Sequence, residues 1–222
     1  MDLQRDVIMY QENSEEIMKL YEKIKPLIKE KLKEFKLLGA SKNKRRIFEE
    51  MVFCLLTPQS KAKRAWKAVL SMKRDNILYK ENSSEIKDYI KGVRFNERKS
   101  EFIILLKNMF FKSEEFFEKI IYEAEILDLR NWLVEKVKGY GLKEASHFLR
   151  NIGKGEKLAI LDRHILKNLV NFGVLTDIHK ALSKNKYLEI EKKMRNFSEK
   201  INIPMDELDL VLWYKETGEV FK

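Results

Sequence analysis

Helical periodicity is the feature that most restricts the fold of this chain. Along almost all of the 222 residues, apolar side chains recur every three or four positions, which is the spacing of one face of an α-helix. The alternation of apolar and polar residues that marks a strand is nearly absent. Roughly ten to twelve amphipathic segments follow one another with short connections, and this pattern predicts a compact all-α array.

Proline and glycine divide these segments. Pro26 is expected to break the first long amphipathic stretch in two, and Gly39 to end its second half. The segment 43–56, NKRRIFEEMVFCLL, predicts a more buried helix. Thr57-Pro58 should end that helix, and Ser60 is expected to cap the next one.

Composition favours a soluble protein with an anionic partner. The chain carries 45 Lys and Arg against 35 Asp and Glu, a net charge of +10, and such a balance favours nucleic acid. The longest apolar runs, MVFCLL and FIILL, are too short to span a membrane, and no signal peptide is apparent. Cys54 is the one cysteine, so it excludes an internal disulfide and a four-cysteine cluster; we interpret it as a buried packing residue.

The stretch 138–153, KGYGLKEASHFLRNIG, predicts a helical hairpin. Leu127–Lys138 forms the first helix, GYG the tight turn and Lys143–Asn151 the second helix, which Gly153 ends. Gly139 and Gly141 can take a positive φ or let another backbone approach closely. The turn then points backbone N–H groups outward at the positive end of a helix, which favours a DNA phosphate. The alternative is a plain hairpin whose glycines only turn the chain.

Two charged residues near this hairpin suggest chemistry. Lys143 lies in the first turn of the second helix, where a cation opposes the helix dipole and the neutral, nucleophilic amine is favoured. Asp162 precedes RHILKNL, so it can cap that helix and stay ionised. An amine facing a carboxylate is what a glycosylase with lyase activity requires. A solvated lysine and a purely structural cap are the alternatives.

The wider pattern resembles a known family. GYGLKEASHFLRNIG followed by LAILDRHIL is similar to the helix-hairpin-helix motif of DNA repair glycosylases. More narrowly it resembles the archaeal-type (second-type) 8-oxoguanine DNA glycosylase/AP lyases, and MVFCLLTPQS, GVRFNERKSEFI, KYLEIEKKM and ELDLVLWYKETGEVFK extend the match over most of the chain. The resemblance implies an all-α, two-domain helical array with the helix-hairpin-helix at about 127–152 and the active-site cleft between the domains. We expect one domain at 1–57 plus 160–222 and the other at 58–159.

The resemblance also implies a reaction. Lys143 would attack C1′ of the damaged nucleotide and form a Schiff base, and Asp162 would activate it or stabilise the developing charge. The imine makes the C2′ proton acidic, so β-elimination would cut the strand.

Four further residues receive roles from the resemblance, each with a plainer alternative. Phe95 would fill the space left by the flipped base, or turn into the core. Gln59 would probe the strand, or be merely exposed or a helix cap. Trp213 would stack on the damaged base, or belong to the core. Lys222 and its terminal carboxylate would recognise 8-oxoguanine, or fray at the chain end.

DNA would dock through Gly139, Gly141, Lys138 and Arg163, while His147 is interpreted as structural. The expected partner is double-stranded DNA with 8-oxoguanine or abasic sites, bound by a monomer in a prokaryotic cytoplasm, at the nucleoid when acting, with no membrane partner. No cofactor, metal or iron–sulfur cluster is expected, apart from a structural monovalent cation at the hairpin carbonyls that the wider superfamily suggests. Two other functions stay open: a non-catalytic helix-hairpin-helix module, and a glycosylase for another damaged base.

Overall fold

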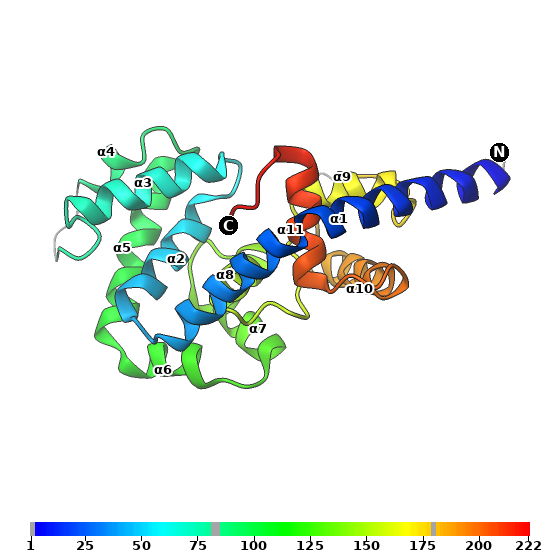
Figure 1. Cartoon of the computed structure of the whole chain (residues 1–222). Helices are drawn as coiled ribbons and strands as arrows, with labels where there is room; N and C mark the ends of the chain where they lie inside the picture. The colour runs from blue at the N-terminus through cyan, green and yellow to red at the C-terminus, as the bar shows by residue number, and fades with distance from the viewer. Residues whose placement is uncertain (1–2, 81–84, 179–180) are drawn as a thin grey trace. The chain divides into compact units, whose positions relative to one another are not determined.

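The computed structural model describes residues 3–80, 85–178 and 181–222, and within them the regular structure is helical and no strand occurs (Figure 1). This confirms the all-α prediction. None of the helices in these ranges has the apolar length that a bilayer crossing requires. The helices are α1 (Leu3–Ala40), α2 (Lys44–Leu56), α3 (Ala62–Arg74), α4 (Ile86–Tyr89), α5 (Asn96–Lys112), α6 (Glu114–Tyr122), α7 (Ile126–Lys136), α8 (Leu142–Asn151), α9 (Arg163–Asn171), α10 (Lys184–Lys200) and α11 (Met205–Thr217).

The helices form two compact units. The first joins the residues up to Lys36 with Gly155–Lys222, and the second is Leu37–Lys154. Our sequence-based division kept residues 37–57 with the two chain ends, whereas their contacts place them in the second unit. The reason is that α2 packs against α3, α5 and α8.

Helix α1 runs through Pro26 without a break, so the predicted division there is wrong. A proline inside a helix costs about 3 kcal/mol. The apolar face nevertheless continues on both sides of it, since Ile24 and Ile28 are buried. Burying one such side chain is worth about 1.5–3 kcal/mol, so two of them outweigh the proline.

Gly39 does not end α1, which continues to Ala40. Its role is to allow close packing: a Cβ at Gly39 would lie 2.1 Å from the carbonyl oxygen of Ile152, which directly follows α8. Only a residue without a side chain fits against that backbone.

Helix α2 is buried from Ile47 to Leu56, including Cys54, which confirms the expected packing role of that residue. The burial includes two carboxylates. Glu49 accepts hydrogen bonds from Tyr79 Oη at 2.6 Å and Lys73 Nζ at 2.9 Å. Buried charge is costly unless it is paired. Helix α2 can therefore lie in the core of its unit only because these bonds are formed.

Candidate active site

The predicted helical hairpin is present as α7 and α8, which pack against each other. Gly139 has φ +92°, and a Cβ there would lie 2.6 Å from the Phe102 ring, so this glycine combines a left-handed backbone with a close approach. Of the two alternatives for Gly141, the positive φ is not realised, because its φ is −108°, in the extended region. Its N–H donates to Glu144 Oε2 at 3.0 Å at the start of α8.

Two polar contacts hold the hairpin to α2. Between the glycines, the buried Tyr140 donates from Oη to the carbonyl of Met51 at 2.8 Å, and burial raises the pKa of its phenol. At the end of α8, Asn151 Nδ2 donates to Glu50 Oε2 at 3.0 Å. The turn and the far end of α8 are therefore both fixed to the same buried helix. The sequence analysis treated Tyr140 only as part of the turn.

Lys143 lies in the first turn of α8, as predicted. Its Nζ donates to Thr57 Oγ1 at 3.1 Å and pairs with Glu144 Oε1 at 3.2 Å. The side chain is only 19% exposed, so the alternative of a solvated lysine is wrong. The sequence analysis expected Asp162 as the carboxylate near this amine and did not consider Glu144, which lies directly beside it. His147, one turn further on, is buried with its ring edge-on to Phe53, in keeping with a structural role.

A second lysine, which the sequence analysis missed, lies at the same place. Lys99 of α5 is buried and donates to the carbonyls of Leu56 at 2.9 Å and Pro58 at 2.8 Å. We call Leu56, Thr57 and Pro58 the α2 corner. Burial, and then the positive charge of Lys143, lowers the pKa of Lys99 to about 8.

A sequence signal for Lys99 did exist. It occupies the apolar face of α5, where Ile103, Leu106 and Phe110 follow at helical spacing and are buried. A lysine on such a face must find hydrogen-bond acceptors inside the protein. The pattern could therefore have marked Lys99 as a buried polar group, although not its partners.

Asp162 belongs to the first unit and caps α9, as predicted. Its Oδ1 accepts both capping bonds, from the backbone N–H groups of His164 at 2.8 Å and Ile165 at 2.9 Å. Arg163, the first residue of α9, is exposed.

Trp213 is partly exposed where α11 packs against α9. The His164 ring meets the indole edge-on at 5.3 Å between centroids. Glu216, one turn later, pairs with Lys167 at 2.9 Å and ties α11 to α9. Lys222 is of intermediate exposure in the same unit. Trp213 is thus neither fully in the core nor free of it, and its stacking role stays a prediction.

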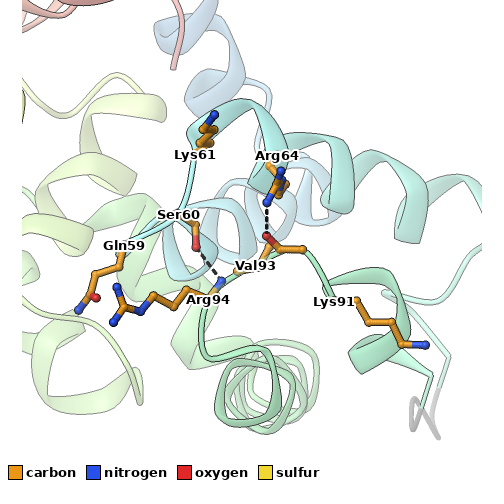
Figure 2. A pocket seen from close by; sticks show the side chains of 8 residues that line it. Gln59, Ser60, Lys61, Arg64, Lys91, Val93 and Arg94 are labelled. Carbon is orange, nitrogen blue, oxygen red and sulfur yellow. Dashed lines mark hydrogen bonds between the residues drawn. The ribbon is translucent and has the colours of Figure 1, made fainter.

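A basic hollow of about 360 Å³ lies on the second unit, between the start of α3 and the turn that precedes α5. Its charged lining residues are all cations: Lys61, Arg64, Lys91 and Arg94. In Figure 2 the side chains of Gln59 and Arg94 extend to the same side, whereas Lys91 points away from them.

The backbone around this hollow corrects two expectations. Ser60 does not cap α3, because its Oγ accepts from the backbone N–H of Arg94 at 3.0 Å instead (Figure 2). Phe95 does not turn into the core: it is 50% exposed, with the Arg94 guanidinium 5.0 Å from its ring. Gln59 is exposed too, and both Gln59 and Phe95 have left-handed backbones, φ +54° and +59°.

Comparisons with known proteins agree with this architecture. Residues 28–203 match the family model described as 8-oxoguanine DNA glycosylase. An 8-oxoguanine DNA glycosylase/AP lyase of Fusobacterium nucleatum is 44% identical over 209 residues, which are 93% of this chain and 96% of that protein.

Two crystal structures are also similar. The 8-oxoguanine DNA glycosylase of Thermotoga maritima has a TM-score of 0.85 and 31% identity, covering 96% of this chain and all of that one. The Methanocaldococcus jannaschii 8-oxoguanine glycosylase/lyase, in complex with a 15mer DNA containing 8-oxoguanine, has a TM-score of 0.85 and 34% identity, covering 94% and 99%.

Gly139→Ala should destabilise the protein more than Gly173→Ala. Both glycines have positive φ, but a Cβ at Gly173 meets nothing within 4 Å, whereas one at Gly139 meets the Phe102 ring. Both variants incur about 1–2 kcal/mol of backbone strain, and Gly139→Ala adds about 1–3 kcal/mol of overpacking. Urea unfolding of the two variants measures the difference. Equal losses would contradict the tight packing of the hairpin turn.

Proposed function

The chain belongs to the 8-oxoguanine DNA glycosylase family, and on that premise we propose that it removes 8-oxoguanine from DNA and cuts the resulting abasic strand. The observation that carries this proposal is the setting of Lys143. A largely buried amine, held by the Thr57 hydroxyl in the first turn of the second hairpin helix, suits a nucleophile better than a surface charge.

The reaction needs a neutral Lys143 Nζ and a nearby negative charge. Nζ attacks C1′ while the C1′–N bond to the base breaks and its electrons leave with the base. Asp162 offsets the positive charge that builds on the sugar. Nζ then loses a proton, the C1′–O4′ bond of the sugar breaks and O4′ takes up a proton, so the C1′ adduct opens to an imine, which acidifies the C2′ proton. Loss of that proton expels the 3′ phosphate, so the strand breaks by β-elimination.

DNA binding is assigned to exposed basic groups and to the hairpin turn. Gly139 and Gly141 present the turn to a phosphate, and the exposed Lys138 and Arg163 add positive charge. The basic hollow around Arg64 adds further positive charge on the second unit. Because backbone contacts by cations supply most sequence-independent affinity, these groups suit any duplex that carries a lesion.

We assign recognition of the lesion to aromatic and polar side chains. Phe95, exposed and held in a left-handed conformation, is suited to enter the gap left by a flipped base. Gln59, exposed on the α2–α3 connection, is assigned to the strand beside it. Trp213 supplies a flat face for the base, and Lys222 supplies polar recognition. We further propose a monomer that needs no cofactor, with a structural monovalent cation at the hairpin carbonyls.

Lys143→Gln should abolish the covalent adduct that borohydride traps between the protein and an 8-oxoguanine duplex. Glutamine is one atom shorter than lysine but can still form hydrogen bonds, and it has no nucleophilic amine. DNA binding should change less than about threefold, since no phosphate contact is assigned to Lys143. Lys136→Gln, an exposed change in the first helix of the same hairpin, is the matched control and should still be trapped.

The trapping experiment also separates the alternatives. A wild-type protein that binds DNA but gives no adduct would be the non-catalytic module. Adducts with other damaged bases and none with 8-oxoguanine would indicate a different lesion. An adduct from Lys143→Gln would show that another amine is the nucleophile.

Asp162→Asn should separate the two roles of this side chain. Asparagine keeps an oxygen for the N–H groups of His164 and Ile165 but loses the negative charge. Stability should therefore change little, while the single-turnover excision rate falls about 100- to 1,000-fold. Asp162→Ala should lose the same activity and, in addition, about 1 kcal/mol of stability. An Asp162→Asn protein with the wild-type rate would reduce this residue to a cap.

A further inference from the structure

Lys99 stands beside the proposed nucleophile without any role in the reaction described above. It shares the α2 corner with Lys143: Lys99 Nζ binds the carbonyls of Leu56 and Pro58, and Lys143 Nζ binds the hydroxyl of Thr57 between them. All of these residues lie in the second unit. We propose that Lys99 is a positioning residue, which fixes the α2 corner so that Thr57 aims the amine of Lys143.

The hydroxyl of Thr57 has a defined direction. Its Oγ1 donates to the carbonyl of Cys54 at 2.8 Å, so its single proton is engaged and its lone pairs accept from Lys143 Nζ. A neutral amine that donates one N–H to Thr57 keeps its own lone pair for carbon. The direction of that lone pair therefore follows the position of Thr57.

The α2 corner needs hydrogen bonds from a residue outside it. It begins with Leu56 in the last turn of α2, where backbone carbonyls have no partner within the helix. It also leads directly into Gln59, whose left-handed backbone is unfavourable for a residue with a side chain. Lys99 donates hydrogen bonds to a carbonyl on each side of Thr57, so it holds together the residues where the regular helix ends. The lowered pKa of Lys99, caused by burial and then by Lys143, fits two amines that share one small volume.

A double-mutant cycle tests the inference, which rests on the proposed function of Lys143. Lys99→Met and Thr57→Val should each slow single-turnover trapping about 10- to 100-fold, because a misplaced nucleophile reacts slowly. Affinity for the duplex should stay within about twofold of wild type. If Lys99 acts through Thr57, the double variant should be no slower than the slower single variant. Lys99→Arg, which keeps a cation for both carbonyls, should recover most of the rate.

Lys107→Met is the matched control, since Lys107 is another buried lysine of α5 and its Nζ binds the carbonyl of Lys80 instead. It should lose stability without slowing the reaction. Should Lys99→Met fail to fold, Thr57→Ser and Thr57→Val test the positioning of Lys143. Thr57→Ser keeps the hydroxyl and should keep the rate of single-turnover trapping, whereas Thr57→Val lacks the hydroxyl and should react slowly.

A wild-type rate in Lys99→Met or Thr57→Val, or losses that multiply in the double variant, would overturn the inference. These outcomes leave the proposed nucleophile untouched, because that assignment fails only if Lys143→Gln is still trapped.

Discussion

The second unit depends on one constraint: helix α2 has no solvent-exposed face from Ile47 to Leu56, so its polar groups must be satisfied by neighbouring elements. Lys73 and Tyr79 satisfy Glu49. On the hairpin side, Asn151 satisfies Glu50 and Tyr140 binds the carbonyl of Met51; on the α5 side, Lys99 binds the carbonyl of Leu56. Removing one such partner would leave a buried group unpaired at a cost of about 1–3 kcal/mol.

The same contacts place the reactive groups. Because Tyr140 and Asn151 hold both ends of the GYG–α8 segment against α2, the first turn of α8 lies at the C-terminal end of α2, where Lys143 meets Thr57. The chain then leaves this corner through the left-handed Gln59 and lines the basic hollow. The buried helix α2 thus ends beside the amine of Lys143, and the residues that follow α2 line the basic hollow, which suits an anion. Stability and proposed chemistry share these residues, so we expect changes in α2 to affect both.

The sequence could predict the features that depend on residues close together in the chain, but not those that depend on residues far apart in it. The helices, the hairpin turn and the Asp162 cap depend on neighbours within a few positions, and these expectations are confirmed. Pro26 failed as a break because buried side chains on both sides outweigh its local cost. Ser60 failed as a cap because the N–H of Arg94, distant in the chain, takes its hydroxyl. Lys99 was missed because its acceptors are backbone carbonyls more than forty positions earlier. The roles of Asp162, Trp213 and Lys222 toward DNA stay predictions.

The identity of the attacking amine is the central claim, and mapping the trapped adduct tests it most directly. Borohydride reduces the imine that the wild-type protein forms on an 8-oxoguanine duplex; the product is digested with protease, and the DNA-linked peptide is sequenced by mass spectrometry. The account predicts a sugar remnant on Lys143. A remnant on Lys99, the neighbouring lysine with its pKa lowered to about 8, or on any other amine would contradict it.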